Sequence, residues 1–284
     1  MLKISVFTVM IPDLTPEDGG KALKANGYDG VEWRVTAPKM DKSKTPEFWS
    51  NNWCTLDLTP DEARRARAIA EANGLTIPGV GTYIEVGDVA AAEQAMEFAQ
   101  ICGARNVRVN PGRWPDPDGL SYADSYARAR KFLGDCEALS KRYGVRAMIE
   151  IHHGTIVCSA ALAHRLVDGF DPDHIGVLHD AGNMVHEGFE NYDMGIQLLG
   201  PYLAHVHVKN GAYEQPAGGG VWQSRWSPLE DGVVNWDNLF AALKKANYQG
   251  WLGVEDFSNV RPTSEALAFN LKFLKEAVAR AYGE

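Results

Sequence analysis

The sequence predicts a (β/α)8 barrel that forms one domain over residues 1–284 and carries its active site at the carboxyl ends of the strands. Eight short apolar or β-branched runs recur along the chain, each followed by a longer segment of helical periodicity. This pattern is typical of parallel α/β architecture. The length of 284 residues suits such a barrel, which takes about 250 residues. Residues 22–32 (ALKANGYDGVE) also resemble 242–255 (ALKKANYQGWLGVE), as two helix–turn–strand repeats would.

The first half of the chain holds four predicted strands: KISVFT (3–8), GVEWRV (30–35), TIPGVGT (76–82) and NVRVN (106–110). Helices fill most of the gaps between them. The helix before the third strand is marked at both ends. Thr59 can cap it, with Glu62 completing a capping box, and Pro60 suits its first position. Gly74 then supplies the stop.

The second half holds the other four predicted strands: RAMIEIH (146–152), IGVLHD (175–180), LAHVHVK (203–209) and WLGVED (251–256). Side chains alternate between the two faces of a strand, so residues two apart point the same way. The inward faces are then Met148, Glu150 and His152; Gly176, Leu178 and Asp180; Leu203, His205 and His207; and Trp251, Gly253 and Glu255. Each of these strands therefore sends a polar side chain inward near its carboxyl end, where barrel enzymes hold their catalytic residues.

We expect Glu150, Asp180, His207 and Glu255 to converge on one divalent cation. Three carboxylates and an imidazole suit such an ion, with Mn²⁺ favoured over Mg²⁺ by the nitrogen ligand and with Co²⁺ or Zn²⁺ as alternatives. Taken singly, an acid at a strand end is more often a helix cap or an ion-pair partner of an Arg such as Arg108. The metal interpretation depends on all of them lying at the same height. His205 is expected one layer below, as a hydrogen-bonded residue.

Two segments are longer than the repeat requires. Residues 36–58 contain Phe48, Trp49 and Trp53, and residues 210–234 contain GGGVWQSRWSP. Both follow strands, where barrel loops build the active-site face. We expect them to form walls of the substrate site, the alternative being peripheral packing or an oligomer contact.

Charge and composition exclude several partners. A formal net charge of −9 would repel a phosphate backbone, so we expect no nucleic-acid partner. No apolar run of about 18 residues appears, and the first residues become polar too early for a signal peptide. We therefore expect a cytoplasmic protein that makes no membrane contact. The four cysteines show no Cys-x-x-Cys spacing, which favours reduced core thiols.

Several of these segments carry a family resemblance: EIHHG (150–154), LHDAGNMVHEG (178–188), HVHVKN (205–210), PLEDGVVNW (228–236) and GVEDF (253–257). Together they resemble the xylose isomerase-like superfamily of sugar isomerases and epimerases over nearly the whole chain. The resemblance implies that Glu150, Asp180, His207 and Glu255 hold a metal. Ketose 3-epimerases usually have a His where Asn183 stands and an acid near Lys209 and Asn210, which argues against their usual reaction. The DNA-repair branch uses more His ligands and a basic surface, and this sequence has neither.

The Trp-rich insert and IHHGTIV (151–157) also resemble the α subunits of C-glycoside deglycosidases. These enzymes cleave 3-oxo-glycosides by β-elimination, and they work with a small β subunit. The resemblance therefore implies a hetero-oligomer in that case. For the isomerase or epimerase alternative we expect a homo-oligomer.

Isomerisation, epimerisation and β-elimination share one difficult step, the removal of a proton from the carbon beside a carbonyl group. A metal that holds the carbonyl oxygen would stabilise the resulting enediolate. Glu150 or Glu255 can take the proton, and His152 can act as a second acid or base.

We expect the substrate to be a carbohydrate or glycoside that contacts Arg108, Lys209, Trp222, Arg225 and Trp226. For the tryptophans the alternative is core packing. For Lys209 it is a simple ion pair. A metal-dependent sugar isomerase or epimerase is the first functional hypothesis. A deglycosidase and a non-catalytic, metal-stabilised sugar-binding protein are the alternatives.

Overall fold

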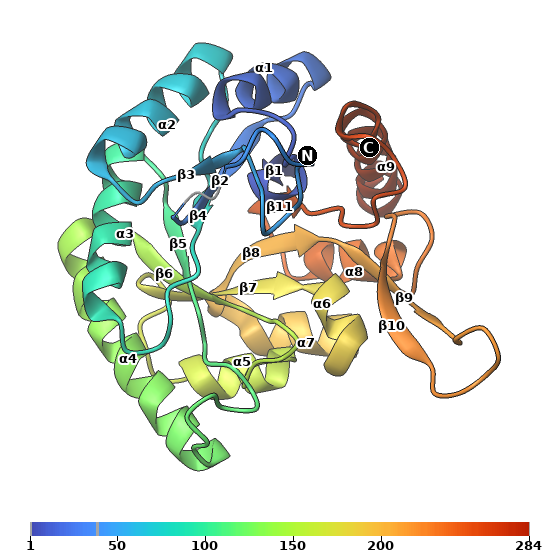
Figure 1. Ribbon diagram of the computed structural model, residues 1–284. Helices are drawn as coiled ribbons and strands as arrows, with labels where there is room; N and C mark the ends of the chain where they lie inside the picture. Colours follow the sequence, from blue (N-terminus) through green and yellow to red (C-terminus); the bar gives the residue numbers. More distant parts are fainter. Residues whose placement is uncertain (1, 38–39, 284) are drawn as a thin grey trace.

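The computed structural model describes residues 2–37 and 40–283, and within them eight parallel strands close into a barrel. These strands are β1 (Lys3–Phe7), β2 (Gly30–Val35), β4 (Gly79–Gly81), β5 (Asn106–Val109), β6 (Arg146–Glu150), β7 (Ile175–Asp180), β8 (Leu203–Val208) and β11 (Trp251–Val254). Strand β1 pairs in parallel with both β2 and β11, which closes the ring. The long helices lie outside it (Figure 1). The predicted fold class is confirmed.

The connections between strands are mostly helical, as expected. The α-helices are α1 (Pro16–Asn26), α2 (Pro60–Asn73), α3 (Val89–Cys102), α4 (Tyr122–Tyr143), α5 (Ala160–Val167), α6 (Ala181–Glu187), α7 (Tyr192–Leu199), α8 (Trp236–Lys245) and α9 (Thr263–Tyr282). Two 3-10 turns precede or follow strands, η1 (Thr8–Met10) and η2 (Gly200–Tyr202).

Helix α2 shows how the sequence sets such a connection. Thr59 Oγ1 accepts the backbone N–H of Glu62 at 3.3 Å, and Gly74 ends the helix in the left-handed region at φ 67°. Both ends lie where the capping residues predicted them. The buried residues Ala63, Ala66, Ile69 and Ala70 recur at the three- and four-residue spacing that places one face of a helix against a core.

The barrel interior below the site is packed with large side chains. Phe7 and Met148 are fully buried. A Cβ atom on Gly81 would overlap the ring of Phe7, so this position has room only for a glycine. The ring of Phe7 stacks on that of His207 with centroids 5.8 Å apart. The small residue on β4 thus makes space for the ring that supports His207.

The two long segments contain strands that the sequence pattern did not reveal. Strand β3 (Thr55–Leu56) adds to the edge of β2, with Thr55 opposite Arg34. Strands β9 (Asn210–Glu214) and β10 (Gln223–Ser227) form a separate antiparallel hairpin, which projects away from the barrel in Figure 1. Of the predicted wall 36–58, residues 38–39 lie outside the described residues.

The cysteines behave as expected of core thiols. All four are free; Cys54, Cys102 and Cys136 are buried, and Cys158 is partly buried. Burial raises the pKa of the Cys136 thiol to about 12, which keeps it protonated and unreactive. None of the described helices has the length and apolar character needed to cross a membrane.

Candidate metal centre and its cavity

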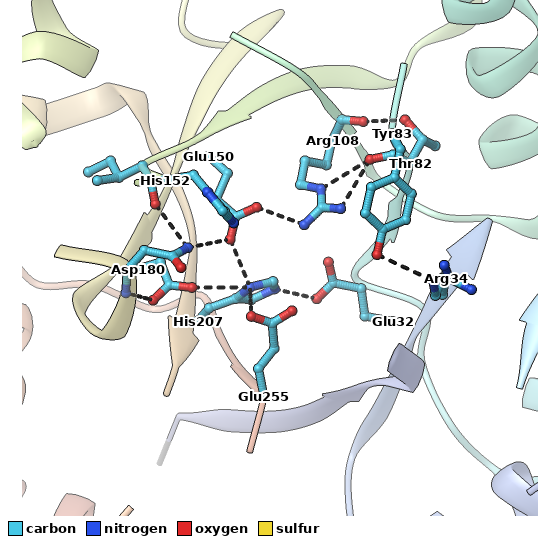
Figure 2. Close-up of polar contacts among 12 residues, drawn as sticks. Glu32, Arg34, Thr82, Tyr83, Arg108, Glu150, His152, Asp180, His207 and Glu255 are labelled. Carbon is cyan, nitrogen blue, oxygen red and sulfur yellow. Dashed lines mark hydrogen bonds and ion pairs between the residues drawn. The ribbon is translucent and has the colours of Figure 1, made fainter. Parts of the chain in front are cut away.

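Consecutive strands bring four ligand-type side chains together. Glu150 and Asp180 end β6 and β7, His207 lies near the end of β8, and Glu255 follows β11 directly. Each offers one ligand atom, and these atoms all lie within 4.8 Å of one another. The register explains the common height, because His207 is opposite Asp180 on one side and Gly253 on the other. Figure 2 shows the four side chains pointing toward one another.

Both carboxylate oxygens of Glu150 accept hydrogen bonds. Arg108 Nη1 donates to Oε2 at 2.7 Å, and Asn183 Nδ2 donates to Oε1 at 3.0 Å. Asn183 also donates its backbone N–H to Asp180 Oδ1 at 2.9 Å, which caps helix α6. Asn183 therefore fixes two of the four side chains at once, and Glu150 is held from both sides.

Lys209 connects the other two carboxylates. Its Nζ lies 2.8 Å from Asp180 Oδ2 and 2.5 Å from Glu255 Oε2, and its side chain is almost fully buried. The ammonium group also lies over the rings of Trp226 and Phe257, 5.0 and 5.2 Å from their centroids. These aromatic contacts add to the ion pairs that hold Lys209 in place.

Burial opposes ionisation of the three carboxyl groups, and their neighbours decide the result. Burial raises the pKa of Glu150, but the Arg108 guanidinium and the other neighbours that favour its charged form, His207 foremost, together hold this pKa well below its usual range. Burial acts in the same sense on Glu255, whose pKa Lys209 and His207 nevertheless lower to about 2. For Asp180, burial dominates: against the pull of Lys209 it raises the pKa to about 7, with the neighbouring carboxylates adding to it. The cluster is thus short of positive charge.

A buried nitrogen at the centre of the cluster, Nδ1 of His207, lacks a hydrogen bond. His207 Nδ1 lies 3.3 Å from Glu255 Oε2, 3.7 Å from Glu150 Oε1 and 3.8 Å from Asp180 Oδ2. This nitrogen has no hydrogen-bond partner, and Asp180 Oδ2 has only its ion pair with Lys209. Burial lowers the pKa of His207, but carboxylates including that of Glu32 raise it well above its usual value. A cation placed among these atoms would take the role of the proton that they otherwise attract.

The charges of the whole contact network fit one divalent cation. The network comprises Glu32, Glu150, Asp180, Glu255, Arg108 and Lys209 around the imidazoles. With neutral imidazoles, its four carboxylates and two cations leave two negative charges. Oxygen ligands with one nitrogen suit Mn²⁺ somewhat better than Mg²⁺. The residues present therefore fit the predicted cation.

A cavity of about 400 Å³ opens onto the cluster, and Glu150 and Glu255 both line it. Such a volume lies within the range of roughly 300–1,000 Å³ that is usual for small-molecule sites. Aromatic side chains form one wall: the ring of Phe257 lies 4.9 Å from that of Trp49 and 5.8 Å from that of Trp226, between centroids. Flat apolar walls beside polar ligands suit a carbohydrate or a glycoside.

Most of the residues predicted to contact substrate are at this cavity. Arg108, His152, Lys209 and Trp226 line it, and Trp49 does so from the other long segment. Arg108 and Lys209 are also the ion-pair partners of the clustered acids. His205 lies below the cluster as predicted, buried and bonded to Glu32 through Nε2 at 3.0 Å.

Trp222 and Arg225, also predicted to contact the substrate, do not line this cavity. Trp222 lies beyond the three glycines at the tip of the hairpin, is 61% exposed and does not line the cavity. Arg225 pairs with Glu214 on the neighbouring strand at 2.9 Å. Because side chains alternate along β10, Arg225 points away from the cavity that Trp226 faces. Trp53, the remaining tryptophan of the predicted walls, does not line the cavity either.

Glu32 and Tyr83 are among the residues of the site that the sequence analysis did not predict. Glu32 lies in β2, between the fully buried Val31 and Trp33. An acid inside an apolar strand is itself a signal, because a buried carboxylate requires partners. Tyr83 lines the cavity, and its hydroxyl accepts a hydrogen bond from Arg34 Nε at 3.3 Å. It follows β4 at the end where barrel sites are built, one residue beyond the predicted strand.

The fold and the site together define a TIM-barrel protein whose strand ends deliver a carboxylate and histidine cluster to one cavity. The family model described as xylose isomerase-like TIM barrel matches residues 21–277, and the chain belongs to that family. The resemblance drawn from the motifs is thereby confirmed.

The individual relatives and solved structures below share 30% sequence identity or less with this chain. Inosose dehydratase 2 of Bacillus cereus is 30% identical over 155 residues, which cover 49% of this chain and 50% of that protein. The chain thus matches about half the length of this relative. Among solved structures, a D-tagatose 3-epimerase-like protein superposes with a TM-score of 0.74 at 15% identity, covering 99% of both chains. The 3-keto-D-glucoside 4-epimerase from E. coli gives 0.73 at 16% identity, covering 97% and 100%. These two structures support the fold.

Proposed function

We propose that this protein is an enzyme that holds one divalent cation, with Mn²⁺ favoured, and removes a proton from the carbon beside the carbonyl group of a carbohydrate. The observation that carries the proposal is the convergence of three carboxylates and an imidazole nitrogen on the wall of one cavity. Glu150, Asp180, Glu255 and His207 Nδ1 would be the ligands. When bound, the cation would supply Lewis-acid stabilisation of the charge that develops on the carbonyl oxygen.

Glu255 is the proposed base. Its hydrogen bond from Lys209 falls on Oε2, so Oε1 is the oxygen left for a substrate proton. Glu150 differs, because Arg108 and Asn183 occupy both of its oxygens. A base must come within hydrogen-bond reach of the proton that it takes, and the asymmetry favours Glu255 for this role.

His152 supplies the second proton-transfer group. Its Nδ1 lies 2.6 Å from the carbonyl oxygen of His153, and since a carbonyl only accepts, Nδ1 carries the hydrogen. Burial lowers the pKa of His152 below its usual value, although Glu150 pulls the other way. The ring is therefore neutral at pH 7, with its lone pair on Nε2. It can accept a proton from a hydroxyl and return it to a leaving group.

One base with a separate proton donor points to β-elimination. Glu255 would take the proton beside the carbonyl, and a hydroxyl or an aglycone on the next carbon would leave with the bonding electron pair. His152 Nε2 would pass to it a proton accepted from a neighbouring substrate hydroxyl, whose oxygen would regain a proton from Glu255. The name of the relative inosose dehydratase describes such a loss of water, which supports this outcome.

Isomerisation or epimerisation is the second candidate. It is favoured by Glu150 and Glu255 lining the cavity from different strands, although Glu150 would first have to release a hydrogen bond.

Solvent exchange tests the proposal. In D2O with Mn²⁺, we expect the protein to introduce deuterium beside the carbonyl of an inosose or a 3-oxo-glucoside, and EDTA to stop the exchange. NMR of the recovered sugar measures both deuterium and loss of the β-substituent. Binding of these sugars without any exchange would instead indicate the non-catalytic sugar-binding alternative.

The aromatic wall gives a second prediction, which concerns the size of the leaving group. We expect Trp226→Ala to raise KM for a 3-oxo-glycoside with an aromatic aglycone by roughly two- to tenfold, the equivalent of an aromatic contact of about 0.5–1.5 kcal/mol. Trp222→Ala is the matched control, since Trp222 is exposed at the hairpin tip. Equal effects of both changes would count against an aglycone beside Trp226, and with it against the deglycosidase alternative.

A further inference from the structure

A carboxylate one layer below the candidate metal centre contacts two histidines. Glu32 is fully buried, and its Oε2 lies 3.0 Å from Nε2 of His205 and 3.0 Å from Nε2 of His207. Figure 2 shows Glu32 beside His207, on the opposite side of the ring from Asp180. A carboxyl group is a stronger acid than an imidazolium, so a hydrogen shared across either of these contacts belongs to the ring nitrogen and Glu32 is the carboxylate.

An ionised carboxylate accepts hydrogen bonds and cannot donate them. Each of the two imidazoles must then carry a hydrogen on Nε2. In neutral His207 this leaves the lone pair on Nδ1, the nitrogen that lies 3.3 Å from Glu255 Oε2 and lacks a hydrogen-bond partner. The contact with Glu32 thus decides which nitrogen of His207 is available to a cation.

We propose that Glu32 is the positioning residue of the metal centre, because it fixes the Nε2–H form of His207 and orients Nδ1 toward Glu150, Asp180 and Glu255. This inference rests on the proposed function. A carboxylate behind a ligating histidine fixes the ring and increases the basicity of the nitrogen that binds the metal. Glu32 comes from β2, on the far side of β1 and β11 from β8, so it acts across the barrel.

Strand β11 leaves space for this arrangement. A Cβ atom on Gly253 would lie 2.8 Å from His205 Nε2, 2.8 Å from His207 Cδ2 and 3.0 Å from Glu32 Oε2. Any side chain at Gly253 would therefore displace the Glu32 contact with both histidines. Gly253→Ala offers a way to disturb that contact without changing any charge.

The same three residues also satisfy the distance criterion for a cation site of their own. A cation there would need His207 to bind metal through both nitrogens, which requires loss of the Nε2 hydrogen. The separations of 3.0 Å are ordinary hydrogen-bond lengths. We therefore expect one cation per chain and not two.

Metal affinity tests the role of Glu32. We expect Glu32→Gln, which keeps the size of the side chain but removes its charge, to weaken Mn²⁺ binding by about 10- to 100-fold in titration calorimetry. Gly253→Ala should weaken it as well. His205→Gln is the matched control: it alters the same buried layer but leaves the bond between Glu32 and His207, so the affinity should stay within about threefold, small beside the loss expected for Glu32.

The unsubstituted protein provides a readout that does not depend on variants folding. With ¹⁵N-labelled histidine and diamagnetic Zn²⁺ bound, long-range ¹H–¹⁵N spectra should show His207 protonated on Nε2. Protonation on Nδ1, two cations per chain, or equal affinity of the wild type and Glu32→Gln would overturn the inference. Failure of the wild type to bind Mn²⁺ at all would instead overturn the proposed function.

Discussion

Replacing Glu255 by Gln should reduce the rate of proton exchange by at least roughly 10²- to 10⁴-fold, the usual contribution of a general base. The change removes the proposed base and one charged ligand together. Glu150→Gln should be as damaging for a different reason, because it removes a ligand and leaves the buried Arg108 without its acid partner. Deuterium exchange into an inosose, followed by NMR, measures both effects.

Glu230→Gln is the matched control for these two variants, since it makes the same chemical change at an ion pair with Arg261 near the surface. It should leave exchange unchanged. Bound Mn²⁺ should be quantified in every variant, so that loss of the ligand can be separated from loss of the base. If Glu255→Gln retained a tenth of the wild-type rate with its metal bound, another residue would have to be the base.

In the metal-free protein, Lys209→Met should lower the free energy of unfolding by about 3–5 kcal/mol, the usual cost of removing one partner from a buried ion pair. Met keeps an apolar stem against Trp226 and Phe257 but leaves Asp180 and Glu255 without the ammonium group. Adding Mn²⁺ should restore more stability to this variant than to the wild type, because the cation then supplies the missing charge. Urea unfolding at pH 8, with EDTA or Mn²⁺, measures both parts.

Lys245→Met is the comparison for this experiment. Lys245 is 61% exposed and pairs with Asp193 at 2.8 Å, so its loss should change the unfolding free energy by about 0–1 kcal/mol. Equal stability of Lys209→Met and the wild type in EDTA would show that the buried ion pairs contribute little.

The barrel could be predicted from the sequence because each unit carries its own signals. Buried parallel strands appear as apolar runs, and α2 shows its ends through Thr59 and Gly74. The four clustered side chains could be predicted because period-two alternation and strand ends are local properties. Their common height depends on register, which the pairing of Asp180 with His207 supplies.

What could not be predicted depends on contacts between distant segments. The glycine-rich segment that holds β9 and β10 is typical of a loop, to which no alternation applies, so Arg225 is expected on the same wall as Trp226. Glu32 contacts histidines more than 170 residues away in the sequence. Its strand is buried at every position, so an apolar pattern alone provides no face on which to place it.

The two ends of the hairpin formed by β9 and β10 have different surroundings. Its base carries Trp226, opposite Gly211, into the cavity, whereas its tip carries Val221 and Trp222 out into solvent. Insertions or deletions at residues 215–222 would leave the pairing at the base, and every proposed ligand, unchanged. The tip can therefore vary without altering the cavity, whereas a library of substitutions meant to change the substrate belongs at the base, beside Trp226.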